Sequence, residues 1–213
     1  MRRIAGRDDI CDLILDAVDT LLARFGYKKM TMDDVARQVG IGKGTIYLHF
    51  PGKEELVLAH VDRIAARVTA RLREIADSPA PPSDRIREML RARVLVRFDS
   101  VVHYSQNLGD LLSSIRNTLI TRRQAHFANE AKVLEDVLRA GARSGALDCP
   151  DPAAVSRALV LSTNSLLPFD LSARELGQRD ELKARVTGIA DLLIRGLTPR
   201  RPMSGGRDAS TGV

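Results

Sequence analysis

Apolar residues recur every three or four positions along most of the chain, which is the spacing of amphipathic α-helices. The first stripe begins at Ile10 and ends at Phe25, and Gly26 follows it at a place that favours a left-handed helix stop. Its other members are Leu13, Ile14, Ala17, Val18, Leu21 and Leu22. No run shows the period of two that marks a half-buried strand. The pattern therefore predicts an all-α protein.

Short segments follow the first stripe. Thr31 has the side chain of an N-cap, with acids in the next turn, so a short helix should begin there and end near Val39. Gly40 breaks that helix, and we expect a second short helix over residues 43–50. After Pro51-Gly52, a longer helix should cover residues 53–75.

A proline-rich stretch, Ser78 to Ser83, is the clearest interruption of the chain. We expect an N-terminal domain over residues 1–52, a connecting helix over 53–78, a helical domain over 79–198 and a disordered tail over 199–213. Within the larger domain, the pattern predicts a helix from about Asp84, a shorter one holding Leu108 to Ile115, and a long one from about 119 to 143. Two more helices are expected over 151–167 and 180–197.

Composition is that of an ordinary globular protein. The 213 residues are 44% hydrophobic and 28% charged, with a net charge of +6 and a pI near 9.7. Residues 1–60 nevertheless hold nine basic and nine acidic side chains, so charge alone does not locate a nucleic-acid site. No apolar stretch is long enough for a membrane span, and Cys11 and Cys149 suit a reducing compartment as small core residues. We expect a cytoplasmic protein.

The two short helices and their glycine turn have the spacing of a helix-turn-helix. Drawn as a wheel, the second helix points Ile46 and Phe50 inward; Gly44, Thr45 and Leu48 point outward, flanked by Lys43, Tyr47 and His49. A short polar face with flanking donors suits a helix in the major groove of DNA, where donors hold phosphates and central residues meet base edges.

Gly44 is unusual for a helix, because glycine there costs about 1 kcal/mol relative to alanine. Close approach of the backbone to DNA would explain it. Leu48 lies on the same face and could touch a thymine methyl, although an incidental surface leucine is an equally good interpretation.

The segment from Thr31 to Leu56, TMDDVARQVGIGKGTIYLHFPGKEEL, resembles the DNA-binding segment of TetR-family transcriptional regulators, and the match is dense over residues 8–60. The resemblance implies a homodimeric regulator, usually a repressor, whose helical C-terminal domain dimerises and binds a small ligand. By position, Thr31, Tyr47, His49 and Lys53 should contact phosphates, while Lys43, Gly44 and Thr45 lie nearest the bases. Gly42 and Gly52 depart from the family, which often has a serine cap there.

Other interpretations are weaker. Gly40 to Thr45 lacks the preceding strand and the spacing of a phosphate-binding loop. No catalytic motif or clustered Cys/His spacing occurs, so we expect no enzyme, cofactor or metal. A helical adaptor that uses the same helices on a protein partner remains the alternative, and it predicts no salt-dependent DNA binding. Arg2, Arg3 and Arg7 could reach DNA, but a solvated tail is the simpler interpretation.

The expected mechanism joins these parts. Two copies pair through the last two helices, so that two reading helices meet an inverted-repeat operator, and a ligand shifts their spacing. Few aromatic residues favour an aliphatic or small apolar ligand. Candidate pocket residues, which could equally be plain core, are Met89, Phe98, Val102, His103, Leu112, Phe127 and Asn164. Replacing Tyr47 and Lys53 with alanine should weaken binding to every DNA sequence, whereas changes at Thr45 should alter sequence preference.

Overall fold

The computed structural model describes residues 7–103, 108–167 and 177–199, and within these ranges the fold is all-α, as predicted. Its helices are α1 (Arg7–Lys29), α2 (Met32–Val39), α3 (Lys43–His49), α4 (Lys53–Ala76), α5 (Pro82–Val101), α6 (Leu108–Arg143), α7 (Pro152–Ser162) and α8 (Arg179–Gly196). A single 3₁₀ turn, Asn164–Leu166, follows α7. None of the described helices is both long and apolar enough to cross a bilayer.

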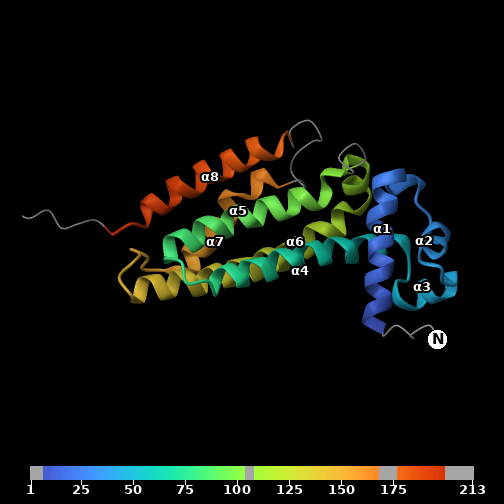
Figure 1. The fold of residues 1–213 in the computed structure, drawn as a ribbon, viewed down its shortest axis with the longest axis horizontal. Helices are drawn as coiled ribbons and strands as arrows, with labels where there is room; N and C mark the ends of the chain where they lie inside the picture. The colour runs from blue at the N-terminus through green and yellow to red at the C-terminus, as the bar shows by residue number, and fades with distance from the viewer. Residues whose placement is uncertain (1–6, 104–107, 168–176, 200–213) are drawn as a thin grey trace, which may run out of the picture.

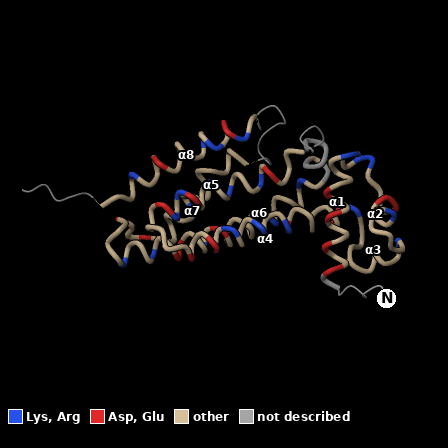
Figure 2. Tube along the Cα trace, viewed as in Figure 1, with Lys and Arg blue, Asp and Glu red and all other residues tan. Residues whose placement is uncertain are grey.

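The helices form an elongated molecule with a small three-helix head at one end (Figure 1). In the head, α1 stands across the long axis, with α2 and α3 on its outer side. From there α4 runs back along the body, where it lies beside α5 and α6, while α7 packs on α6 and α8 on α5. Basic and acidic residues are interspersed along most of the helices of both parts (Figure 2), whereas α3 and α7 each hold one lysine or arginine and no acidic residue.

Local signals placed the turns of the head correctly. Gly26 adopts a φ of 70° and Gly40 a φ of 75°, the left-handed conformation that only glycine adopts at little cost. Thr31 is the N-cap of α2, as predicted. Gly26 ends the regular part of α1, and the amide of Gly40 donates to the carbonyl of Ala36 to close α2.

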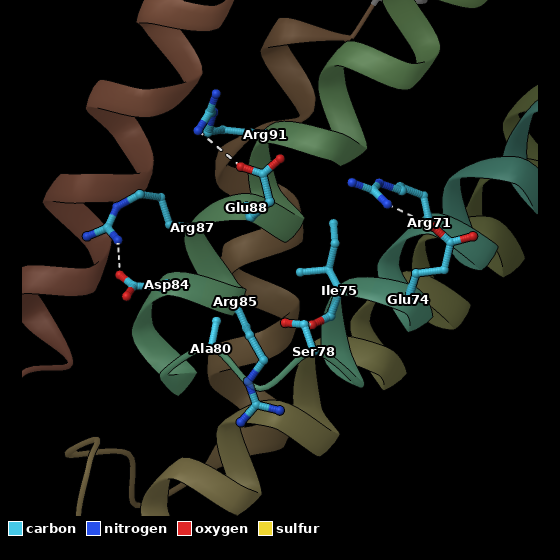
Figure 3. Close-up of a pocket in the computed structure, with 10 residues that line it drawn as sticks. All are labelled: Arg71, Glu74, Ile75, Ser78, Ala80, Asp84, Arg85, Arg87, Glu88 and Arg91. Carbon is cyan, nitrogen blue, oxygen red and sulfur yellow. Dashed lines mark hydrogen bonds and ion pairs between the residues drawn. The ribbon is translucent and has the colours of Figure 1, made fainter.

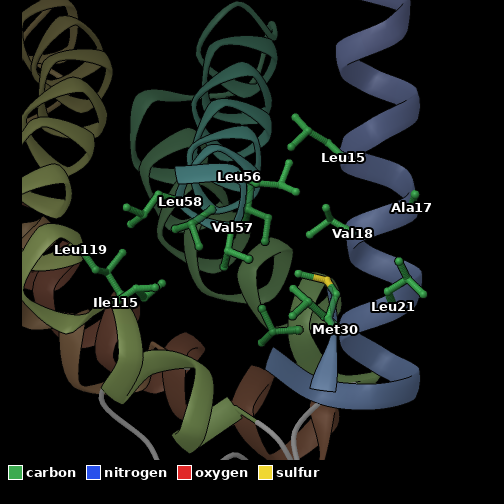
Figure 4. Close-up of a cluster of buried hydrophobic side chains, with 14 of the residues drawn as sticks. Leu15, Ala17, Val18, Leu21, Met30, Leu56, Val57, Leu58, Ile115 and Leu119 are labelled. Carbon is green, nitrogen blue, oxygen red and sulfur yellow. The ribbon is translucent and has the colours of Figure 1, made fainter. Parts of the chain in front are cut away.

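A continuous apolar core joins the head to the body. Side chains of α1 such as Ile14 and Val18 pack with Leu56 and Val57 of α4, and the same cluster extends to Leu119 of α6 (Figure 4). Each buried apolar side chain of this size contributes about 1.5–3 kcal/mol by leaving water. The head is therefore anchored to the body through the first two turns of α4.

Two members of the predicted first stripe lie outside this core. Leu13 is half exposed, and Phe25 is exposed beside the guanidinium of Arg24, which lies 5.0 Å from the centre of the ring. The stripe was therefore predicted too wide, because α1 buries only the part of its surface that meets α2, α4 and α6.

The body differs from the prediction in three places. The shorter and longer helices expected over 108–143 are one helix, α6, because Arg116-Asn117-Thr118 between them contains neither glycine nor proline. The helix expected from Asp84 begins at Pro82, with Asp84 in its first turn. The helix expected to reach residue 167 ends at Ser162 before the 3₁₀ turn. The arm residues Arg2 and Arg3 and the tail beyond Pro199 lie outside the described residues.

Candidate nucleic-acid interface

The short helix α3 has one buried and one exposed side. Ile46 is fully buried and Phe50, at the C-cap, nearly so, and both join the core of the head with Val35 of α2. On the other side, Leu48 is 81% exposed and Tyr47 45% exposed, as the wheel predicted. The helix therefore has one anchoring face and one face open to a partner.

Two glycines shape that open face. A methyl group added at Gly44 would meet no neighbouring atom within 4 Å, so the protein's own packing does not require glycine at this position. Gly42 is the N-cap of α3 and makes no side-chain cap bond, so the first turn of α3 lacks the stabilisation that serine or aspartate would give. The backbone at the start of α3 is thus open to approach from outside. Thr45 is half-buried next to it.

Thr31 is locked by a reciprocal capping box at the start of α2. The amide of Asp34 donates to Thr31 Oγ1 (3.1 Å), and the amide of Thr31 donates to Asp34 Oδ2 (3.0 Å). The hydroxyl of Thr31 also donates to Asp34 Oδ2 (2.6 Å), and these bonds lower the pKa of Asp34. The side chain of Thr31 is therefore held in place at the surface of the head.

Lys43, the first residue of α3, forms an exposed ion pair with α2. Its Nζ donates to Asp33 Oδ2 at 2.8 Å, and this hydrogen bond raises the pKa of Lys43. The ion pair thereby ties the amine at the start of α3 to a side chain of α2.

Lys53 and His49 are more enclosed than expected for simple phosphate contacts. The Nζ of Lys53 lies 4.3 Å from the ring centre of Tyr27 and donates to the carbonyl of Lys28 (3.4 Å), and burial lowers its pKa. The half-buried His49 places Nδ1 3.3 Å from Cys11 Sγ. Cys11 is thus only partly in the core, whereas Cys149 is buried as predicted.

The residues expected to line a ligand pocket are spread over the body. Met89 and Phe98 are buried in the core, while Val102 and His103 are exposed, with His103 Nε2 3.2 Å from Asp19 of α1. Phe127 and Asn164 do line one cavity, of about 360 Å³, between α6 and α7. The side chain of Leu112 lies outside the described part of the structure. Met89 and Phe98 belong to the apolar stripe of α5, and the structure buries both of them in the core.

A second hollow, of about 450 Å³, lies between the end of α4 and the start of α5 (Figure 3). Its charges are largely satisfied by each other: Arg71 pairs with Glu74, Arg87 with Asp84, and Arg91 with Glu88. Arg85 donates to the carbonyl of Ala76 at the end of α4. This hollow is therefore a network of surface ion pairs.

The sequence analysis did not predict a buried cluster of charged residues, nor a contact between a buried histidine and an aspartate. Arg93, Arg97 and Glu130 are fully buried between α5 and α6, and the buried His60 of α4 contacts Asp19 of α1. Arg93 and Arg97 fall on the same stripe as Ile86 and Leu90, so charge on an otherwise apolar face was the available signal.

The comparison with known families decides the identity of the head. The family model for bacterial regulatory proteins of the tetR family matches residues 14–60, which include α2, α3 and the turn between them. Over these residues the chain matches the TetR family.

Curated relatives of the chain are HTH-type transcriptional regulators. The uncharacterized HTH-type regulator YhgD of Bacillus subtilis is 42% identical over 71 residues, 33% of this chain and 35% of YhgD. The HTH-type transcriptional repressor KstR2 of Mycobacterium tuberculosis is 29% identical over 153 residues, 68% of this chain and 73% of KstR2. The chain spans between 35% and 44% of the length of the first curated relatives it matches.

A solved structure supports the whole fold. A TetR-family regulator from Pectobacterium atrosepticum superposes with a TM-score of 0.71 at 22% identity, covering 93% of this chain and 99% of that one. At that identity the likeness establishes the fold, including the body that the family model does not reach.

Proposed function

We propose that this chain is a sequence-specific, ligand-responsive transcriptional regulator that acts as a repressor. The observation that carries the proposal is the two-sided build of α3: Ile46 fixes the helix to the head, while Gly44, Tyr47 and Leu48 stand free on the other side. The helix is 7 residues long and this face of it is almost uncharged, which suits entry into a major groove. The match to KstR2, named a transcriptional repressor, is longer than the match to FasR, named a transcriptional activator, so the proposal of repression follows the longer of the two.

In this proposal the contacts divide into two groups. Thr31, Tyr47, His49 and Lys53 hold phosphates, and Lys43, Gly44, Thr45 and Leu48 face base edges. Lys53 and His49 are held against Tyr27 and Cys11, so they suit phosphate contacts close to the head, which fix its orientation on the DNA. Residues 1–52 form the DNA-binding part, α4 connects it, and residues 79–198 take the ligand and the second copy, in the cytoplasm.

The second copy is proposed to bind at α7 and α8. Leu161 of α7 and Leu192 of α8 are 70% and 69% exposed, so each of these two helices presents a large apolar side chain that a second copy could cover. Pairing these helices by a two-fold axis would give a four-helix interface and set two α3 helices about 34–36 Å apart, which requires an inverted-repeat operator. Replacing both leucines with glutamate should yield a monomer in analytical ultracentrifugation.

The experiment that tests the function is selection of bound duplexes from a random DNA pool, followed by binding titrations on the selected sequence. The double variant Lys43→Gln, Tyr47→Phe keeps the shape of α3 and removes one charge and one hydroxyl, so it should lose at least about tenfold in affinity. Lys132→Gln, an exposed lysine on α6, is the matched control and should bind normally. Undiminished binding by the double variant, or no salt-dependent binding at all, would favour the adaptor alternative.

The link between ligand and DNA is proposed to run through α4. Arg122 of α6 donates to Asp62 (2.5 Å) and Glu55 (2.7 Å) of α4, and His126 Nε2 lies 2.9 Å from Asp62. A movement of α6 would therefore pull on the helix that holds the head.

A further inference from the structure

The body contains a buried charged cluster that is out of balance. Arg93, Arg97 and Glu130, called here the arginine cluster, are 0%, 2% and 0% exposed. Two guanidinium groups thus share one carboxylate in the interior. Burying a charge without a full counter-charge is costly, because the low-dielectric interior replaces water poorly.

The hydrogen bonds show where the excess positive charge lies. Glu130 accepts from both arginines, from Arg93 Nε at 2.6 Å and from a terminal nitrogen of Arg97. The remaining partners of Arg93 are neutral: Thr163 Oγ1 and Asn164 Oδ1, each at 2.5 Å. Burial lowers the pKa of Arg93 to about 10, so the group still carries its charge at neutral pH.

The cluster adjoins the cavity between α6 and α7. Asn164, which accepts from Arg93, is a wall of that cavity, and so is Phe127. The ring of Phe127 has the guanidinium carbons of Arg93, Arg97 and Arg123 at 5.0, 5.9 and 5.2 Å from its centre. The rest of the wall is mainly apolar, with Ala131, Val160 and Leu161. At about 360 Å³, the cavity falls within the usual size range of small-molecule sites, roughly 300–1,000 Å³.

We propose that this cavity binds an anionic amphiphile, a molecule with a carboxylate head and an aliphatic body. The carboxylate replaces Asn164 as an acceptor from Arg93 and supplies the missing negative charge, and the aliphatic part lies on Phe127, Ala131 and Val160. This inference rests on the proposed function, whose effector it assigns to a chemical class. It also suggests a route for the signal, because Thr163 and Asn164 follow directly on the end of α7, a helix proposed for the dimer.

Calorimetric titration of the full chain tests the site with octanoate and octan-1-ol, which share a chain and differ in charge. The wild type should bind octanoate at least about tenfold more tightly than octan-1-ol. Arg93→Gln should remove that preference, whereas Arg143→Gln, an exposed arginine at the end of α6 that does not line the cavity, should leave it unchanged. Arg157 lines the cavity, so Arg157→Gln tests the competing arginine. Equal affinity of the wild type for both probes, or loss of the preference in Arg157→Gln but not in Arg93→Gln, would overturn the proposal.

Asn164→Asp covers the case in which Arg93→Gln fails to fold. The new carboxylate has the shape of the native amide and places the missing charge at the acceptor position of Arg93, so it should raise the melting temperature and abolish the preference for octanoate. A lower melting temperature together with an unchanged preference would contradict the assignment.

The experiments distinguish an error in the proposed ligand site from an error in the proposed regulatory function. Binding of the two probes is measured without DNA, and DNA binding is measured without probe. If octanoate binds selectively but the selected duplex is held equally well with and without it, the site is established and the proposed ligand response is wrong. If the duplex is bound but octanoate is not preferred, only the ligand class is wrong.

Discussion

The Nζ atom of Lys43 lies 2.8 Å from Oδ2 of Asp33, so the first cation of α3 is held by a carboxylate of α2. Both side chains are about half exposed, and DNA would approach on this same side of the head. In the free protein Asp33 therefore offsets the charge that Lys43 would bring to DNA, and it repels nearby phosphates.

Asp33→Asn should strengthen DNA binding. The substitution frees Lys43 and removes a negative charge that repels phosphates, so the affinity for any duplex should rise several-fold and should fall more steeply with salt. Titrations at several salt concentrations measure both effects. Asp136→Asn, an exposed acid on α6, should leave both unchanged, and weaker binding by Asp33→Asn would indicate that the pair orients Lys43 for DNA.

Gly44→Ala should stabilise the protein and impair its function. The added methyl group meets nothing in the free protein and removes a glycine from a helix, so the free energy of unfolding should rise by up to about 1 kcal/mol. The same methyl group would stand between α3 and the base edges, so affinity for the selected duplex should fall by about tenfold. Gly40→Ala is the contrasting variant: its φ of 75° makes alanine cost roughly 1–2 kcal/mol. Denaturant unfolding measures the change in stability, and DNA titration measures the change in affinity. Unchanged DNA binding by Gly44→Ala would contradict the proposal that Gly44 allows close approach of the backbone to DNA.

Ile46→Ala and Leu48→Ala should separate anchoring from recognition, although the two residues are neighbours on α3. Removal of the fully buried Ile46 side chain should lower the free energy of unfolding by about 2–5 kcal/mol. Leu48→Ala should change it by less than about 0.5 kcal/mol and should instead alter the preferred operator sequence. A repeated duplex selection with Leu48→Ala measures the second effect, and an unchanged consensus would mark Leu48 as an incidental surface residue.

Asp19 should make the junction between head and body sensitive to acid. Its Oδ1 lies 3.3 Å from Nε2 of His60 and 3.2 Å from Nε2 of His103. Burial alone would raise the pKa of Asp19, but the hydrogen bonds and charges of the two histidines outweigh it and lower the pKa below 3.8. Because the pKa is lowered on folding, the stabilisation is fully present well above pH 3.8 and is lost as the pH falls through the depressed value.

Asp19→Asn should therefore be less stable than the wild type at neutral pH, and the difference should shrink below pH 3.8. Unfolding curves of both proteins across the acid range provide the measurement. Asp12→Asn, an exposed acid on the same helix, serves as the control. A difference that does not depend on pH would show that shape, not charge, matters at this position.

The sequence predicted the head well because its signals are local. The cap at Thr31, the glycine turn at Gly40 and the inward Ile46 each depend on residues within one or two turns, so the helical period was enough to place them. Leu48 and Tyr47 were placed on the open face by the same rule. The body was harder: two helices were expected over residues 108–143, although nothing between Ile115 and Leu119 breaks a helix.

Contacts between distant segments could not be predicted in the same way. The positions of Lys53 beside Tyr27 and of His49 beside Cys11 depend on how α1 crosses the other helices of the head. The arginine cluster needed Glu130 to lie opposite Arg93, 37 positions away in the chain. A charged residue on a buried stripe signals that a partner exists, but it does not identify which residue that partner is.

The unbroken course of α4 has a mechanical consequence. With 24 residues the helix is about 36 Å long, and no glycine or proline interrupts it. A tilt of roughly 5° about its midpoint would displace Lys53 by about 1.5 Å, whereas hydrogen-bond lengths vary by only about 0.5 Å. Such a rod multiplies a slight deformation deep in the body into a misfit at the far end, so an effector needs to rearrange very little to loosen the grip on an operator.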